Sequence, residues 1–301
     1  MSLQSAIYAS HQKLGRLGAS YAVWLEPPTT WEVIPALELL TTKHMTNFFE
    51  RAILEWTDHP EEEDIRAAAS RFMRRYLLSV AAPAYLALAN GVAWDLTLER
   101  ISIVMRPDLP LGAVIDIRGL DAVTTPERPT RWPITPIKGT MVPTLDDLRD
   151  RALRPLFGDV HVRSFERVLG HVHVSPRLLW STAAENVDYY YDNALALLEG
   201  DERAVWAADR ERILFGDTLP GIEGESPLAG LLAWDDFRSD PLFPRLLQVR
   251  TVCCVNYVVP KRDPRYCRTC GLISPDERHD LWRRYANDRD TATAVPWPPK
   301  G

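Results

Sequence analysis

Hydrophobic residues recur at helical spacing along most of the chain. The longest stripe follows an acidic run at 60–64 and places apolar side chains on one helical face. It consists of Ile65, Ala68, Ala69, Phe72, Met73, Tyr76, Leu77 and Val80. Proline and carboxylates suit a first helical turn, so we interpret the acidic run as a helix start rather than a metal site. Pro83 is expected to kink or end this helix, with 84–93 as a buried continuation.

Further helices are predicted where the same spacing meets start and stop residues. Pro27-Pro28 ends the first helix, Thr144 is placed to cap another, and Ser175-Pro176 starts a long one that Gly200 ends. The expected helices cover 3–26, 45–56, 144–156, 176–199 and 201–214. The three consecutive tyrosines at 189–191 cannot all face a core, so at least one ring is expected to face outward.

The hydrophobic period changes from helical to alternating after residue 100. Apolar residues alternate with polar ones over 101–105 and again over 113–117, and a proline-containing connection joins the two runs. This pattern predicts a β-hairpin near 100–119. The Pro- and Thr-rich stretch 124–143 is expected to be a long loop, and the glycine-rich stretch 216–230 a linker.

These patterns predict a mostly helical α+β fold with a small antiparallel hairpin or sheet. We expect two parts, a helical body over 1–230 and a C-terminal cysteine segment over 231–301. A composition of 46% hydrophobic and 25% charged residues is ordinary for a globular protein.

Charge and motifs exclude several classes of function. The net charge of −6 argues against a nucleic-acid partner, which needs a basic face. No apolar run is long enough to predict a transmembrane helix, and the first residues do not resemble a secretory signal, so a cytoplasmic location is expected. P-loop, nucleophile-elbow and dinucleotide fingerprints are also missing, so hydrolase and nicotinamide-binding functions lack support.

All four cysteines lie within 253–270, in the spacing C-C-x12-C-x2-C. Disulfides fit poorly with an intracellular chain. Cys267 and Cys270 have ordinary spacing for zinc, but the adjacent Cys253 and Cys254 do not. A two-iron cluster offers two metal centres and takes four cysteines, so diverging ligands suit it better. Spacing alone leaves zinc and an iron–sulfur cluster open.

Basic residues surround these cysteines. Between 245 and 270 there is one acid, Asp263, against six cations, namely Arg245, Arg250, Lys261, Arg262, Arg265 and Arg268. Positive charge favours the reduced, more negative form of a cluster. It also offers a landing site for an acidic electron donor or an anionic iron chelate. The plainer alternative is a solvated basic loop.

Three histidines, His161, His171 and His173, come close together in the sequence. His171 and His173 would share one strand face and could bind a metal ion. No carboxylate or cysteine nearby completes a ligand set, so we expect histidines that face solvent.

The C-terminal residues resemble the signature of the FhuF-type ferric-siderophore reductases. The matching positions are Arg250, Cys253-Cys254, Tyr257, Pro260 and Cys267-x2-Cys270. The family's usual gap between the two cysteine pairs is shorter than the twelve residues found here. Residues 84–120 also weakly resemble siderophore synthetases that work without modular peptide synthetases, but Thr97-Leu98-Glu99-Arg100 stands where those enzymes carry His-x-Gln-Asn.

The resemblance to the reductases implies a [2Fe–2S] cluster on Cys253, Cys254, Cys267 and Cys270. It implies a reductase that passes one electron to siderophore-bound Fe(III), with an external ferredoxin or flavoprotein as donor. Contact with a siderophore importer at the membrane is a further implied partner. The candidate substrate-binding residues are Arg118, Arg250, Tyr257 and Arg262. The alternatives are a siderophore-binding protein without redox function and a helical protein with structural zinc.

Overall fold

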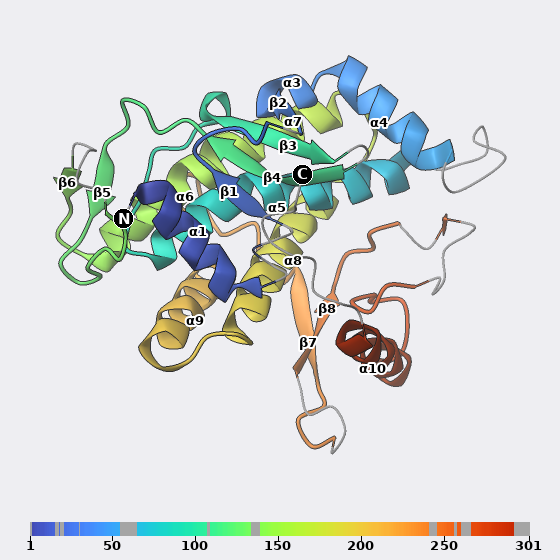
Figure 1. The fold of residues 1–301 in the computed structure, drawn as a ribbon. Coiled ribbons are helices and arrows are strands. Elements are labelled where there is room, and N and C mark those ends of the chain that lie inside the picture. Colours follow the sequence, from blue (N-terminus) through green and yellow to red (C-terminus); the bar gives the residue numbers. More distant parts are fainter. Residues whose placement is uncertain are drawn as a thin grey trace.

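The computed structural model describes residues 2–15, 18, 21–29, 31–54, 65–106, 109–133, 139–240, 246–255, 258–259 and 266–291. Its central element is the long helix α5 (Ile65–Ala89), which packs against the strand β4 and the helix α8 (Figure 1). Every residue of α5 from Tyr76 to Ala89 is buried. The predicted apolar stripe therefore forms the middle of the core from Ala68 onward, whereas Ile65 at its start is 42% exposed.

Pro83 lies inside α5 and does not end it, so that alternative is wrong. A proline in a helix interior costs about 3 kcal/mol or more. Each large apolar side chain that becomes buried contributes about 1.5–3 kcal/mol. Tyr85, Leu86 and Leu88 are all buried beyond the proline, so packing outweighs its cost.

The largest sheet contains four strands in the order β1-β4-β3-β2. Strands β3 (Ile101–Arg106) and β4 (Leu109–Ile115) form the predicted antiparallel hairpin. On its two sides lie β1 (Ala22–Trp24), which is parallel to β4, and β2 (Glu32–Pro35), which is antiparallel to β3. The sheet lies across α5.

The expected helix over 3–26 is too long. Helix α1 covers only Leu3–Lys13, and the chain then forms β1. The backbone N–H of Val23 donates to His11 Nε2 at 2.9 Å, and both residues are buried. Pairing with β4, far away in sequence, thus overrides the local helical pattern.

The other helices of the body pack against α5 or against elements that contact it. Thr144 and Asp147 form the predicted capping box at the start of α6, and Ser175 caps α8 as expected. Gly200 does not end α8 but begins the next helix. The helices are α3 (Ala36–Leu39), α4 (Thr42–Leu54), η2 (Leu98–Arg100), α6 (Leu145–Pro155), the π-helical turn η3 (Leu156–His161), α7 (Val162–Leu169), α8 (Pro176–Leu195) and α9 (Gly200–Phe215).

The stretch 124–143 is not simply a loop. Strands β5 (Ala122–Thr124) and β6 (Gly139–Met141) pair in parallel at its ends. Between them Arg128 is buried and forms an ion pair with Asp209 of α9 at 2.6 Å. This contact fixes the part around Arg128 against the helical body.

The C-terminal segment contributes an antiparallel hairpin and a helix. Strands β7 (Leu232–Asp236) and β8 (Leu246–Arg250) form the hairpin, and α10 (Pro275–Thr291) lies beside it (Figure 1). The fold is therefore mostly helical α+β with small sheets, as predicted. In the part of the chain described, no helix combines the length and apolar character that a membrane span requires.

Candidate iron–sulfur site and neighbouring cavity

The two cysteine pairs lie on neighbouring loops. Cys253 and Cys254 follow β8, whereas Cys267 and Cys270 precede α10. The backbone N–H of Arg250 donates to the Thr269 carbonyl at 2.8 Å and joins the loops. Cys254 Sγ and Cys267 Sγ are 3.9 Å apart. The fold thus brings together thiols from both halves of the sequence motif, and none of the four is in a disulfide.

Backbone donors point at two of the sulfur atoms. Val255 N–H donates to Cys253 Sγ at 3.3 Å, and Leu272 N–H donates to Cys270 Sγ at 3.4 Å. Val255 has φ of 64°, which is unusual for a β-branched residue. Such strain is typical of functional sites. Here it accompanies the turn that directs the Val255 N–H back to Cys253, two residues earlier.

The thiols differ in acidity. The hydrogen bond with Cys267 and the Leu272 N–H lower the pKa of Cys270 to about 7. The hydrogen bond with Cys254 lowers the pKa of Cys267, but the bond with Cys270 and burial outweigh it, so that pKa is raised overall. Metals bind the thiolate, so the lowered pKa of Cys270 suits a ligand.

The four thiols fit an iron–sulfur cluster in their chemistry. Metal–sulfur bonds of about 2.3 Å at tetrahedral angles place two ligands of one metal a little under 4 Å apart. The separation of Cys254 and Cys267 is of this size. Over the described residues, no group of three or more metal-binding side chains is already assembled. The structure therefore places Cys254 and Cys267 at ligating distance, with Cys253 and Cys270 on the same two loops.

A buried carboxylate fastens both loops to the helical body. Glu185 of α8 is 1% exposed, and its Oε2 accepts from Arg250 Nη1 at 2.7 Å. Its Oε1 accepts from Thr269 Oγ1 at 3.2 Å and lies 3.2 Å from Arg74 Nη2 of α5. Burial alone would raise the pKa of Glu185, but Arg74, Arg250 and Arg268 hold it below its usual value. We call Glu185 with Arg74, Arg250 and Thr269 the clamp.

The candidate substrate residues lie in different places. Arg250 is 3% exposed and belongs to the clamp. The side chain of Arg118 is 89% exposed, and its Nε lies 2.8 Å from Asp116 Oδ1 in an ion pair. Tyr257 and Arg262 lie outside the described residues. A role in substrate binding remains a prediction for all four.

The histidine expectation is wrong for His161. Its side chain is buried, and its Nδ1 lies 2.8 Å from the Leu156 carbonyl. His173 is exposed, and His171 contacts Thr46 Oγ1 at 3.2 Å.

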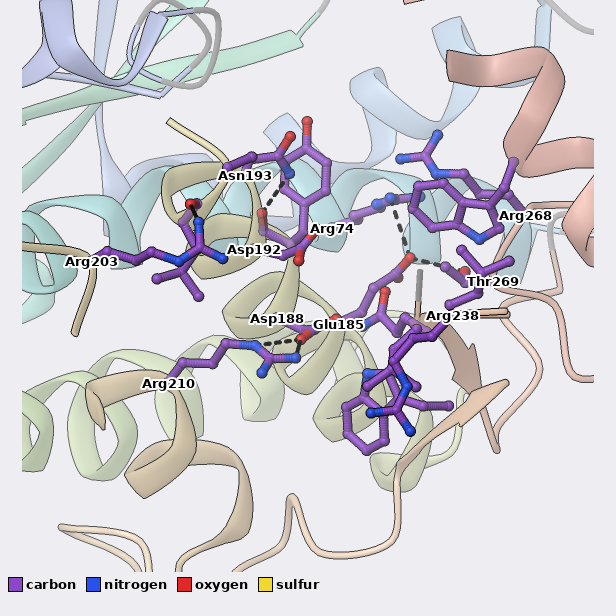
Figure 2. A pocket seen from close by; sticks show the side chains of 18 residues that line it. Arg74, Glu185, Asp188, Asp192, Asn193, Arg203, Arg210, Arg238, Arg268 and Thr269 are labelled. Carbon is purple, nitrogen blue, oxygen red and sulfur yellow. Dashed lines mark hydrogen bonds and ion pairs between the residues drawn. The ribbon is translucent and has the colours of Figure 1, made fainter. Parts of the chain in front are cut away.

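Beside the clamp lies a cavity of about 450 Å³ that the sequence did not predict (Figure 2). Its walls come from α5, α8, α9, the β7–β8 hairpin, the second cysteine loop and α10. Tyr189 lines it, which agrees with the expected outward-facing tyrosine ring. The lining residues are Arg74, Glu185, Asp188, Tyr189, Asp192, Asn193, Leu195, Ala196, Arg203, Arg210, Trp234, Arg238, Leu246, Leu247, Gln248, Arg268, Thr269 and Trp282.

Arginines dominate the charge of this cavity. Five arginines and three carboxylates line it. Arg210 donates to Asp188 Oδ1 at 2.8 Å, yet burial still raises the pKa of Asp188 to about 6. The Arg268 guanidinium lies 4.6 Å from the centre of the Trp282 ring. Figure 2 shows Arg74, Glu185 and Thr269 joined at one side of the cavity.

One solved structure offers a distant comparison. It is aerobactin synthetase IucC from a hypervirulent pathotype of Klebsiella pneumoniae, with 16% identity over 68% of this chain and a TM-score of 0.43. This chain spans only 37% of that synthetase. A likeness at this level supports no conclusion about the fold or the function.

Comparison with curated proteins finds no match. A family model does match, and it is described as "Ferric iron reductase FhuF-like transporter". The match covers residues 70–235, more than half of the chain, and ends before the cysteine loops. The chain therefore belongs to the FhuF-like family of ferric iron reductases.

Proposed function

We propose that this protein reduces siderophore-bound Fe(III) by one electron and so releases Fe(II) in the cytoplasm. In this proposal Cys253, Cys254, Cys267 and Cys270 hold a [2Fe–2S] cluster. The observation that carries it is the approach of Cys254 and Cys267 to 3.9 Å, in a chain of the ferric iron reductase family. The cytoplasmic location belongs to the proposal, because a reducing compartment would keep the four cysteines as thiols.

The cluster would supply storage for one electron at a time. The residues of the chain hold and tune that site. The clamp positions both loops, while Val255 N–H and Leu272 N–H donate to sulfur and favour its negative form. Cys254 and Cys270 are nearly buried, whereas Cys253 and Cys267 are only partly buried. Cys253 and Cys267 therefore lie on the exposed side of the site.

The net reaction needs no general acid, base or nucleophile. Each ferric siderophore takes up one electron and becomes a ferrous complex. Hard oxygen donors hold ferrous iron much less well, so the metal leaves. A reduced ferredoxin or flavoprotein supplies the electron and is oxidised by one electron. This external donor is part of the proposal, because the sequence lacks a nicotinamide-binding fingerprint.

Spectroscopy of anaerobically purified protein tests the proposal. We expect a red-brown protein that contains about two irons and about two acid-labile sulfides per chain. Dithionite should bleach its visible absorbance, and a ferric siderophore should restore it. Replacing Cys253 and Cys254 by Ser should abolish both the absorbance and the reductase activity. A colourless protein without sulfide, or a cluster that ferric siderophores do not reoxidise, would contradict the proposal.

Structural zinc is the second candidate. The 3.9 Å separation of Cys254 and Cys267 also suits a tetrahedral zinc ion, and Cys267-x2-Cys270 has zinc-type spacing. Metal analysis of the same sample separates the two candidates. One zinc per chain with no iron would establish the second.

A further inference from the structure

We propose that the cavity beside the clamp is the site where the ferric chelate binds, and that it selects a chelate with net negative charge and free carboxylates. This inference rests on the proposed function, whose substrate class it narrows. It assigns binding to the cavity rather than to the exposed Arg118 of the β3–β4 hairpin.

The balance of charge points to an anion. Five arginines face three carboxylates across the lining, so the described walls carry an excess of two positive charges. Guanidinium groups bind carboxylates through two parallel hydrogen bonds. A neutral chelate would gain only weaker hydrogen bonds from these groups, and a cationic one would be repelled by them. The whole chain has a net charge of −6, so the cavity has the opposite sign to the chain as a whole.

The size and surface of the cavity suit a small molecule. A volume of about 450 Å³ lies in the range of small-molecule sites. The rings of Tyr189, Trp234 and Trp282 line it along with the arginines. Aromatic faces of this kind hold the organic frame of a ligand while charged groups orient it.

The position of the cavity suits electron transfer to its ligand. Thr269 lines the cavity, and its hydroxyl lies 3.7 Å from Cys267 Sγ. Arg268, next to Thr269, lines the cavity as well. A chelate bound there is thus one side chain away from a proposed cluster ligand. The cavity meets the two needs of the reaction, which are to attract the chelate and to place it beside the thiols.

Arg238 offers a clean test because it lines the cavity but is 68% exposed. It binds Asp236 through two hydrogen bonds of 2.9 and 2.6 Å, so its replacement leaves the core intact. Arg154 is the matched control. It is also exposed and held by a carboxylate, Asp150, through bonds of 3.0 and 2.7 Å, but it does not line the cavity.

The experiment measures binding without reduction. Gallium(III) has the charge of Fe(III) but accepts no electron under these conditions. Calorimetry with the full-length protein compares the anionic gallium complex of a citrate dihydroxamate with the cationic gallium complex of desferrioxamine B. We expect the anionic complex to bind tighter, with an affinity that falls as salt rises. Arg238→Gln should weaken it about fivefold, while Arg154→Gln leaves it unchanged.

Several results would overturn the inference. They are equal binding of the two complexes, equal effects of Arg238→Gln and Arg154→Gln, or loss of binding in Arg118→Gln alone. An effect of Arg238→Gln only on electron uptake from a protein donor would make the cavity a protein-docking site instead. Binding of the anionic complex by a protein that reduces no siderophore would remove the proposed function but keep this site. A protein that reduces ferric siderophores but binds the gallium complex equally well with and without Arg238 would keep the proposed function and remove this site.

Discussion

At the scale of single residues, Glu185 connects the helical body to the proposed metal site. It contacts Arg250, three residues before Cys253, and Thr269, which lies between Cys267 and Cys270. A buried ion pair of this kind adds little stability over apolar packing, but breaking it leaves a charge without compensation. We infer that the clamp serves mainly to hold the two loops in register.

Glu185→Gln should therefore damage both the fold and the site. Loss of the charge leaves the 3%-exposed Arg250 without its carboxylate. We expect the free energy of unfolding to fall by about 3–5 kcal/mol. Iron retained after gel filtration should fall with it. Urea unfolding and iron analysis provide the two measurements.

Glu166→Gln is the control for this prediction, because Glu166 is an exposed helical glutamate. It should change stability by about 0.5 kcal/mol or less. A Glu185→Gln protein that keeps its iron and its stability would contradict the role given to the clamp.

At the scale of elements, the ion pair between Arg128 and Asp209 holds the segment that follows β5 on α9. Arg128 donates to both oxygens of Asp209, and Arg149 of α6 donates to the same carboxylate at 3.0 Å. Asp209 is fully buried. One carboxylate thus joins three separate segments of the chain.

Asp209→Asn should reduce the free energy of unfolding by about 3–5 kcal/mol, since two arginines lose their buried counter-charge. Arg149 also pairs with Asp146, whose side chain is 68% exposed, and Asp146→Asn removes this second partner. That control should cost about 0.5 kcal/mol. Thermal unfolding followed by circular dichroism compares the two. Similar losses in both variants would contradict the role given to the buried pair.

The elements that the sequence predicted well are long or strongly periodic. Helices α5 and α8 and the β3–β4 hairpin carry patterns that packing reinforces. Strand β1, three residues long, was hidden in a helical pattern, and the β7–β8 hairpin and α10 were not predicted. Pairing between distant segments decides such short strands, and local periodicity does not report it.

The candidate site, like the fold, could be predicted only in part from the sequence. The cysteine spacing predicted that the two pairs would meet, and the structure places Cys254 beside Cys267. The cavity could not be predicted, because its lining residues come from distant segments between Arg74 and Trp282. Arg250 gave a signal, as part of the family signature, but its buried contact with Glu185 could not be read from spacing.

At the scale of the whole molecule, stability depends on two buried histidines. His11 accepts a hydrogen bond from Val23 N–H, which requires an unprotonated Nε2. His161 is buried in the π-helical turn between α6 and α7. Burial lowers the pKa of each to about 4, from an ordinary value of 6.5. The folded state therefore binds fewer protons than the unfolded state between these values.

The sign follows from linkage. The stability that these neutral histidines provide is fully present above pH 6.5 and is lost as pH falls through 4. Each contributes about 3 kcal/mol at most. Urea unfolding at several pH values should show this decline. His11→Gln and His161→Asn should each flatten it, whereas replacement of the exposed His173 should not. A pH profile unchanged in both buried variants would contradict the prediction.

The composite walls of the cavity have one more consequence. A molecule seated there touches α5 and α8 on one side and the β7–β8 hairpin and α10 on the other. It would bridge the seam between the family-matched portion and the segment that bears the thiols. By mass action, a bound ligand stabilises the state in which that segment is packed against α8. A bound chelate would then protect the proposed cluster against loss, most strongly when the chelate is abundant.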